Sequence, residues 1–329
     1  MRRVTPHAKR ITHNAQQKSV DSNISFLRSV ERRLKQSHVP SAAVEAERLV
    51  RHFSRLDRLD FFTGQKPVTL RARKSVEAAL KARLSGKPLA YILKEADFFG
   101  LKFFVSPDVL TPRPETEILI EEALKSIPVR PPLKPAIKAS AGPSAIFGGR
   151  RRMTATQTTE VLDLGTGCGC IAVSLTIQRP DCRMTALELS TKALKIARKN
   201  INSNGLEKKI NLLKSDLFSV FGREKKAFFD LIVTNPPYVA AEDFSKLSKE
   251  VLSEPRLALD GGPKGLLLIH AILERAPYFM KPGAWLLMEI GKGQSKSLAK
   301  RITRDERFTN LKFTKDLNGI DRVLAVQKS

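Results

Sequence analysis

The spacing of hydrophobic and polar residues changes along the chain, and the change separates a helical region from a mixed one. Between residues 23 and 85, apolar side chains recur every three or four positions, for example at Phe26, Val30 and Leu34, with charged residues between them. This period is typical of amphipathic helices that bury one face. It predicts a small helical bundle over 23–85. Gly86 follows the last of its helices, where a glycine commonly ends a helix.

A second pattern begins after this region. Residues 98–111 alternate apolar and polar positions around Gly100, which favours a β-hairpin. From Glu160 onwards, short apolar runs alternate with helical periods, and this order predicts a doubly wound α/β fold with a mostly parallel sheet. The predicted helices are 170–178, 191–204 and 266–279, and the predicted strands are 161–162, 184–187, 210–213, 231–234, 285–290 and an antiparallel pair at 310–315 and 322–327.

Two segments lack such periodicity. Residues 1–22 carry five Lys or Arg and one acidic residue, which predicts a disordered basic tail or a start assigned too far upstream, with an organellar transit peptide as the alternative. Residues 128–159 contain five prolines and only positive charges, which predicts a linker or, alternatively, a basic tether for nucleic acid. The predicted domains are therefore a tail at 1–22, a helical domain at 23–85, a hairpin and connector at 86–127, a linker at 128–159 and an α/β domain at 160–329.

Composition narrows the class of protein. The net charge of +25 favours a polyanionic partner or a ribonucleoprotein neighbourhood, with a solvated basic surface as an equal alternative. Three clustered cysteines are too few for a disulfide framework, and no His or Cys pair nearby completes a zinc site, so no metal is predicted. No apolar run reaches membrane-spanning length. We therefore expect a cytoplasmic protein without a membrane span, or one of an organellar matrix if the first residues are a transit peptide.

The tetrapeptide Asn235-Pro236-Pro237-Tyr238 is the most informative motif. It follows the apolar run 231–233, so it lies where a buried strand ends in a loop. The prolines stiffen the turn and lack N–H groups, which leaves carbonyl oxygens free to face a cleft. The Asn oxygen and a Pro carbonyl can accept both hydrogens of a planar NH₂ group, and Tyr238 can stack on it. The motif therefore indicates a site that directs an amide or amine nitrogen at an electrophile, unless it is an incidental proline-rich turn.

A glycine-rich loop follows the first predicted strand of the α/β region and opens the next helix. Its glycines allow close approach of a ligand to the backbone, and the helix N-terminus favours a negatively charged group. The dinucleotide pattern G-x-G-x-x-G is absent, while acids end the next two strands, where they can accept bonds from ribose hydroxyls and an adenine amine. The set favours S-adenosylmethionine over NAD, with helix capping by the acids as the alternative. Its residues are Asp163, Gly165, Thr166, Gly167, Cys168, Gly169, Glu188 and Asp216.

These motifs together resemble the class I S-adenosylmethionine methyltransferases and, within them, the protein-(glutamine-N5) methyltransferases that modify peptide-chain release factors. The resemblance runs from about residue 23 to residue 327, apart from the basic linker. It includes a P-R-P-E-T-E stretch and an E-P-x-x-A-L-x-G-G stretch, which are more specific than N-P-P-Y. The matching segments are 86–92, 98–101, 110–117, 254–262 and 289–291 with Gln294.

The resemblance implies a seven-stranded sheet, S-adenosylmethionine as cofactor, and the glutamine of the Gly-Gly-Gln motif of class-1 release factors as acceptor. It implies that Leu217 and, marginally, Asn235 also contact the cofactor, that the N-P-P-Y residues bind the glutamine, and that Arg113 and Glu117 lie near both ligands. The helical domain would dock the factor, and a monomer is expected. Two departures are notable: Glu188 stands where the family often has Asp, and the basic linker is longer than the family usually shows.

Three alternatives remain open from the sequence. The acceptor could be a glutamine of a ribosomal protein. It could be adenine N6 of DNA, because N-P-P-Y is shared with DNA adenine methyltransferases and the chain is basic, although it has no obvious target-recognition domain. The protein could also bind nucleic acid without catalysis, but simple binding would need neither Asn235 nor the glycine loop.

Overall fold

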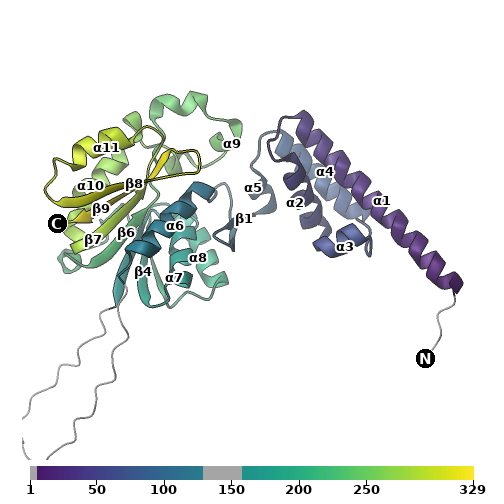
Figure 1. Ribbon diagram of the computed structural model, residues 1–329, viewed down its shortest axis with the longest axis horizontal. Coiled ribbons are helices and arrows are strands. Elements are labelled where there is room, and N and C mark those ends of the chain that lie inside the picture. The colour runs from purple at the N-terminus through teal and green to yellow at the C-terminus, as the bar shows by residue number, and fades with distance from the viewer. Residues whose placement is uncertain (1–5, 129–157) are drawn as a thin grey trace, which may run out of the picture. The chain divides into compact units, whose positions relative to one another are not determined.

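The computed structural model describes residues 6–128 and 158–329, with side chains from residue 17 onwards (Figure 1). The predicted linker at 128–159 thus lies almost entirely outside the described residues. The chain forms two compact units. The first contains the residues up to Ala96 and a returning segment, Leu247–Ser253; the second contains Asp97–Lys246 and Glu254–Ser329.

The first unit is helical, which confirms the predicted bundle. Its helix α1 begins at Pro6, so that residues 6–22, which we expected to form a disordered tail, belong to this helix. Proline at a first helical position loses no hydrogen bond, and the Ala, Lys, Arg and Gln residues that follow it are good helix formers. The helices are α1 (Pro6–Gln36), α2 (Ala42–Ser54), α3 (Arg58–Thr63), α4 (Leu70–Leu84), α5 (Leu89–Leu93) and, in the returning segment, α9 (Lys249–Leu252).

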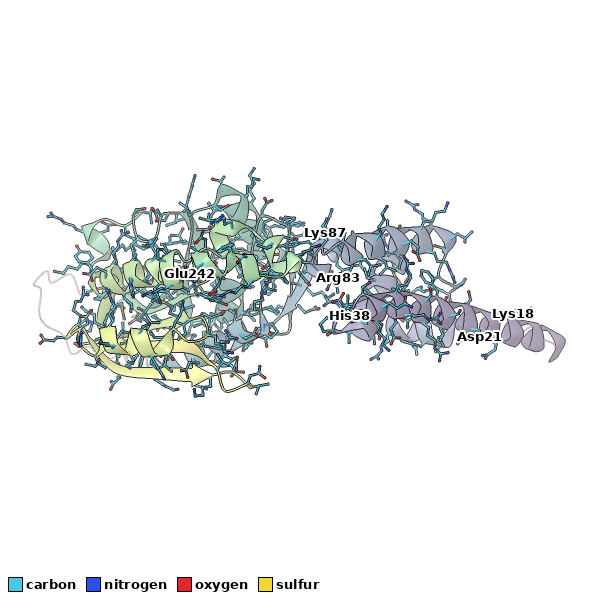
Figure 2. All side chains as sticks on the ribbon, turned by 90° about the horizontal axis from the view of Figure 1, so that it is seen from above. Lys18, Asp21, His38, Arg83, Lys87 and Glu242 are labelled. Carbon is cyan, nitrogen blue, oxygen red and sulfur yellow. The ribbon has the colours of Figure 1, made fainter. Side chains whose placement is uncertain are left out.

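A buried ion pair ties the returning segment to this bundle. Arg83, near the end of α4 (Figure 2), is only 7% exposed and donates to Glu45 at 2.7 and 3.1 Å and to Glu250 at 3.1 Å. Helix α4 ends at Leu84 with Ser85 as its C-cap, one residue before the predicted Gly86, which has a φ of +99° and lets the N–H of Lys87 reach back to the carbonyl of Ala82.

Asn23 supplies a testable stability contribution in this unit. Its fully buried side chain donates to the carbonyls of Phe61 and Lys66 at 3.2 and 3.1 Å and accepts from the N–H of Val68 at 2.9 Å. Asn23→Ala would leave these backbone groups without that partner, so we expect a loss of about 2–4 kcal/mol in the free energy of unfolding. Denaturant titration measures it, with Asn202→Ala on the exposed face of α8 (Thr191–Ser203) as the matched control. Equal stability of the two variants would contradict the assignment.

The second unit contains a seven-stranded sheet in the order β5-β4-β3-β6-β7-β9-β8, in which β9 alone runs in the direction opposite to the other strands. This confirms the predicted doubly wound, mostly parallel fold. The central strands β3 and β6 are buried at every position, as expected for a sheet that helices cover on both faces. The strands are β3 (Thr159–Leu164), β4 (Cys182–Glu188), β5 (Ile210–Lys214), β6 (Phe229–Thr234), β7 (Met280–Glu289), β8 (Phe308–Lys315) and β9 (Asp321–Lys328).

Helices α6, α7 and α8 follow one another across one face of this sheet, and α10 and α11 cover the other (Figure 1). A hairpin of β1 and β2 precedes them, and the division between the units falls within β1. Helices α6 and α11 were not predicted from the apolar pattern. The bounds are α6 (Pro114–Ser126), α7 (Cys170–Gln178), α10 (Leu267–Phe279), α11 (Ser295–Ile302), β1 (Glu95–Phe98) and β2 (Leu101–Phe104).

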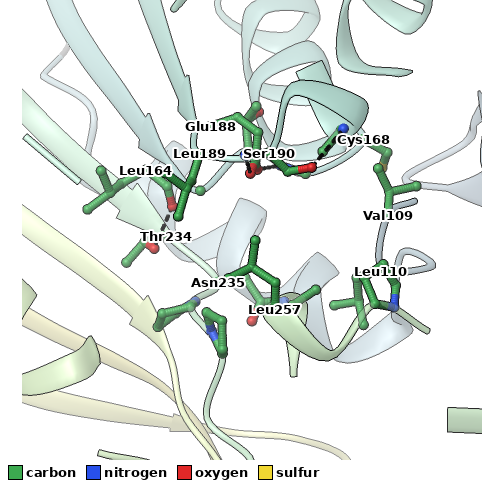
Figure 3. A pocket seen from close by; sticks show the side chains of 18 of the residues that line it. Val109, Leu110, Leu164, Cys168, Glu188, Leu189, Ser190, Thr234, Asn235 and Leu257 are labelled. Carbon is green, nitrogen blue, oxygen red and sulfur yellow. Dashed lines mark hydrogen bonds between the residues drawn. The ribbon is translucent and has the colours of Figure 1, made fainter. Parts of the chain in front are cut away.

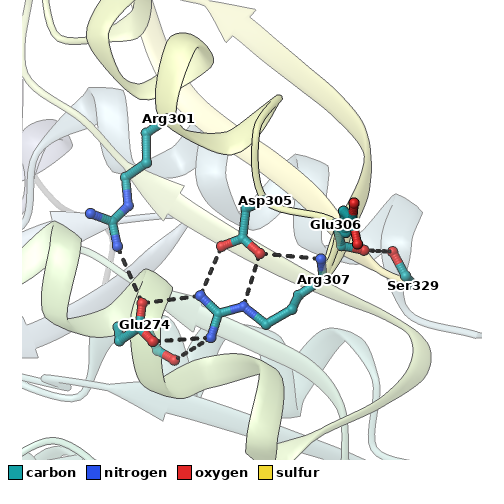
Figure 4. Close-up of polar contacts among 6 residues, drawn as sticks. All are labelled: Glu274, Arg301, Asp305, Glu306, Arg307 and Ser329. Carbon is teal, nitrogen blue, oxygen red and sulfur yellow. Dashed lines mark hydrogen bonds and ion pairs between the residues drawn. The ribbon is translucent and has the colours of Figure 1, made fainter.

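An ion-pair cluster links α10 to the turn before β8 (Figure 4). Arg307 donates to Asp305 at 2.8 Å and to Glu274 at 3.0 Å, and Arg301 also reaches Glu274. The hydrogen bond from Arg307 is the main cause that lowers the pKa of both carboxyl groups. Glu274 is exposed and Arg307 and Asp305 are half-buried, so solvent screens these pairs and each contributes little to stability. No described helix is both long and apolar enough to span a membrane.

Candidate active site

A cavity of about 420 Å³ opens at the carboxyl ends of the parallel strands, entirely within the second unit (Figure 3). Strand β3 lies between β4 and β6, so the chain order reverses there, and such switch points are where open α/β sheets bind ligands. Most of the sequence-predicted site residues line this cavity. They are Arg113, Gly165, Thr166, Gly167, Cys168, Glu188, Asp216, Leu217, Asn235, Pro236 and Pro237.

The glycine loop leaves its backbone open to the cavity. Gly165 and Gly167 have φ of +76° and +58°, and a Cβ at either position would meet no atom within 4 Å. The N–H groups of Gly165 and Thr166 both donate to the carbonyl of Leu187 at 2.9 Å, which ties the loop to β4. A ligand could therefore approach this backbone closely.

Asp163 supports this loop but does not line the cavity. Its Oδ2 accepts from Thr166 Oγ1 at 2.6 Å and from the N–H of Ala172 at 3.1 Å, while its buried Oδ1 has no partner among the described residues. Burial raises the pKa of Asp163 to about 7. These contacts match helix capping, the alternative role of this acid. Gly169 likewise lies outside the cavity lining, at the start of α7, where a Cβ would lie 3.5 Å from Ala197.

Glu188 ends β4 and faces the cavity (Figure 3). Its two carboxylate oxygens accept from the N–H groups of Gly167 at 2.9 Å and Ser190 at 2.8 Å. The two contacts fix the orientation of the carboxylate, and each oxygen can still accept another hydrogen bond from a ligand. Asp216 and Leu217 lie in the turn after β5, and Leu217 has a φ of +47°.

Within the described part of the chain, no group of His, Cys, Asp or Glu side chains could hold a metal ion.

The N-P-P-Y loop leaves β6 directly after Thr234. The side-chain nitrogen of Asn235 donates to Thr116 Oγ1 at 3.1 Å, and Thr116 Oγ1 donates to Glu289 Oε2 at 2.6 Å. No described residue donates a hydrogen bond to Asn235 Oδ1 or to the carbonyl of Pro236. The two acceptor atoms that the sequence predicted for an NH₂ group are therefore available.

Tyr238 has a different place from the one expected. It is not among the residues that line the cavity, and its hydroxyl donates to Glu289 Oε1 at 3.0 Å. Burial and the neighbouring Glu289 raise the pKa of Tyr238. Burial also raises the pKa of Glu289, although the hydrogen bonds from Thr116 and Tyr238 oppose that shift. The tyrosine anchors the loop against the end of β7.

Two glycines explain the A-L-x-G-G stretch and the residues after it. A Cβ at Gly261 would lie 2.7 Å from the carbonyl oxygen of Pro237, and one at Gly265 would lie 2.0 Å from that of Tyr238. The buried side chain of Gln294 also donates to the carbonyl of Tyr238 at 3.1 Å. This backbone therefore packs directly against the N-P-P-Y loop and holds its carbonyls in place.

The P-R-P-E-T-E stretch is fixed by Glu254, whose side chain is fully buried. Glu254 accepts from the N–H of Thr111 at 3.0 Å and from the guanidinium of Arg113, which lines the cavity. Glu117 lies outside the lining and accepts from the N–H of Phe99 at 2.7 Å, where it stabilises the hairpin turn. Thr116, Glu289 and Gln294 had drawn attention only as parts of family-like stretches, because their partners are far away in the sequence.

Comparisons with known proteins agree with this geometry. Residues 150–283 match the family model of the methyltransferase small domain, and residues 25–93 match that of the PrmC N-terminal domain. Among solved structures, the catalytic domain of hMettl16 in complex with MAT2A 3′UTR hairpin 1 is similar with a TM-score of 0.50 and 15% identity, over 77% of this chain and 79% of that one. That likeness shows the fold alone. Fold and family model together define a methyltransferase.

Curated relatives specify the family. Release factor glutamine methyltransferase of Geobacter sulfurreducens is 34% identical over 88% of this chain and 91% of the relative. That of Cereibacter sphaeroides is 36% identical over 92% and 96%, and that of Koribacter versatilis is 35% identical over 91% and 96%. The chain belongs to the release factor glutamine methyltransferase family, which confirms the resemblance seen in the sequence.

Proposed function

We propose that this protein transfers a methyl group from S-adenosylmethionine to the side-chain amide nitrogen of the glutamine in the Gly-Gly-Gln motif of a class-1 release factor. One observation carries the proposal: Asn235 Oδ1 and the Pro236 carbonyl offer two available acceptors in the cavity that the glycine loop lines. The names of the curated relatives supply the acceptor class.

The cavity fits the cofactor. The open backbone at Gly165 and Gly167 and the oriented carboxylate of Glu188 match a ligand with a ribose and a charged amino-acid end. We assign cofactor contacts to Thr166, Cys168, Asp216 and Leu217 as well, with Asp163 and Gly169 supporting the loop from behind. When bound, S-adenosylmethionine supplies a methyl group made electrophilic by its sulfonium, which keeps the electron pair of the broken C–S bond.

Asn235 and Pro236 act on the acceptor. An amide nitrogen is a poor nucleophile because its lone pair is delocalised into the carbonyl. Hydrogen bonds from its two N–H groups to Asn235 Oδ1 and the Pro236 carbonyl raise electron density on nitrogen and hold it in line with the methyl group. No general base is needed early, because the nitrogen becomes acidic only as the new bond forms, and its surplus proton then passes to water.

The position of Tyr238 favours an amide over a DNA base as acceptor. Enzymes that modify a base grip it between aromatic or apolar faces after flipping it out of the duplex. Tyr238, which we expected to provide such a face, points its hydroxyl at Glu289 and does not line the cavity. An amide needs only the two acceptors that Asn235 and Pro236 offer.

The helical unit is the proposed docking surface for the release factor, with the enzyme acting as a monomer. The charge of +25 should accelerate encounter with an acidic partner, and added salt should then slow association. Contact with nucleic acid or the ribosome through basic segments is the further role this charge suggests.

Glu188→Ala is expected to weaken S-adenosylmethionine binding about 10- to 100-fold, because it removes charged hydrogen-bond acceptors and frees the N–H groups of Gly167 and Ser190. Isothermal titration calorimetry measures the change. Glu207→Ala removes the same charge from an exposed position in the same unit and should bind normally. Unchanged affinity in Glu188→Ala would place the cofactor elsewhere.

The proposed reaction is tested by offering labelled S-adenosylmethionine with three acceptors in parallel: a class-1 release factor, a preparation of ribosomal proteins, and duplex DNA. We expect label in the release factor and none in a factor whose Gly-Gly-Gln glutamine is replaced by alanine. Label only in DNA or in a ribosomal protein would establish one of the alternative acceptors instead.

A further inference from the structure

The orientation of the Asn235 amide decides whether it can bind the glutamine that receives the methyl group. The proposed reaction needs its oxygen in the cavity, because the glutamine NH₂ group has hydrogens to donate. If the amide group of Asn235 turned by 180° about its last side-chain bond, it would present its own NH₂ group and repel the NH₂ group of the glutamine. An asparagine side chain has nearly the same shape in both orientations, so hydrogen bonding must select one.

A buried chain of hydrogen bonds makes that selection. The Glu289 side chain is 1% exposed, and each of its two carboxyl oxygens accepts a hydrogen bond from a neighbouring hydroxyl. Its Oε2 lies 2.6 Å from Thr116 Oγ1 and its Oε1 lies 3.0 Å from the hydroxyl of Tyr238. Thr116 has a single hydroxyl proton, and the contact with Glu289 uses it.

The Thr116 oxygen then has only lone pairs to offer Asn235. The contact of 3.1 Å between Thr116 Oγ1 and the Asn235 side chain must therefore use Asn235 Nδ2, which leaves Oδ1 for the acceptor. We propose that Thr116 and Glu289 are positioning residues that fix the Asn235 amide with its oxygen toward the substrate glutamine. This inference rests on the proposed function for the identity of the acceptor.

The residues of this hydrogen-bond network come from three separate elements. Thr116 lies in the first turn of α6, Asn235 directly follows β6, and Glu289 ends β7. This arrangement gives the P-R-P-E-T-E stretch a function inside the second unit. Its threonine donates its one hydroxyl proton to Glu289 and can therefore only accept from Asn235. Charged neighbours are Glu115 on α6, which raises the pKa of Glu289, and Arg322 on β9, which lowers it.

The first test separates hydroxyl chemistry from packing. Thr116→Val keeps the shape of the side chain but removes the hydroxyl, so Asn235 can turn. We expect kcat to fall on the order of 10- to 100-fold, with the KM for the release factor and the affinity for S-adenosylmethionine within a few-fold of wild type. Thr116→Ser restores the hydroxyl and should recover most of kcat.

Thr176→Val is the matched control, since Thr176 is also buried in the second unit, on α7, and donates to the carbonyl of Ala172. It should retain wild-type kcat. Wild-type kcat in Thr116→Val, or a kcat as low in Thr116→Ser as in Thr116→Val, would overturn the proposal. If Asn235→Ala loses activity in the same assay, the proposed function stands even then.

The second test does not depend on the acceptor. Neutron diffraction from crystals of the deuterated full-length protein locates the two deuterons of the Asn235 amide directly. We expect them on the atom that faces Thr116, with the Thr116 deuteron directed at Glu289. Deuterons on the atom that faces the cavity would refute the positioning role whatever the substrate is.

Discussion

Asn235→Ala is expected to lower the turnover of methyl transfer about 10²–10³-fold while the affinity for S-adenosylmethionine stays within a few-fold. The side chain offers one of the two acceptors that orient the glutamine nitrogen, and the structure engages it only through its nitrogen, with Thr116. Losing Oδ1 removes both the hydrogen bond and the alignment of the nucleophile, whereas the glycine loop and Glu188 remain in place.

Steady-state kinetics with a release factor and calorimetry with the cofactor measure the two effects separately. Asn202→Ala, at an exposed position on α8 in the same unit, is the matched control and should match wild type in both. Near wild-type turnover in Asn235→Ala would mean that the N-P-P-Y loop does not hold the acceptor.

Gly265→Ala is expected to lower kcat by about 10²-fold or more and to destabilise the second unit. The new Cβ would lie 2.0 Å from the carbonyl oxygen of Tyr238, so one of the two backbones must move, and a displacement of about 1 Å in a catalytic loop can cost about 10²-fold in rate. Gly265 also has a φ of +68°, which penalises any side chain by about 1–2 kcal/mol.

Gly205→Ala separates the two causes. Gly205 has a nearly equal φ of +66°, but its Cβ would meet nothing within 4 Å. This control should lose stability only through backbone strain and should keep its kcat. If both variants had the same free energy of unfolding and the same kcat, the close packing of Gly265 against the N-P-P-Y loop would not contribute to catalysis.

The sequence predicted the elements whose apolar pattern is strong. Helix α7 was predicted with the bounds that the structure has, and β6 differs only at its first residues, because a fully buried strand reads as a continuous apolar run. Helix α6 was not predicted, because its first four residues, 114–117, belong to the P-R-P-E-T-E stretch and include no apolar position that would start a helical period. Helix α11 is short and was not singled out.

The candidate site could be predicted only in part. Asn235 and Pro236 follow β6 and Glu188 ends β4, so their placement at the sheet edge follows from the fold class. The role of Tyr238 could not be inferred, because its partner Glu289 lies 51 positions further along the chain. The same holds for Gly261 and Gly265, whose need for a missing side chain arises from a close approach to the N-P-P-Y loop that no local pattern encodes.

Tandem mass spectrometry of a release factor shows directly whether this chain methylates its glutamine. The factor is incubated with the full-length protein and S-adenosylmethionine, then digested, and the peptide containing Gly-Gly-Gln is sequenced. We expect that glutamine to gain the mass of one CH₂ group, with Asn235→Ala and a factor carrying Gln→Ala giving unmodified peptides. An unmodified glutamine after incubation with folded, cofactor-binding protein would show that the release factor is not the methyl acceptor.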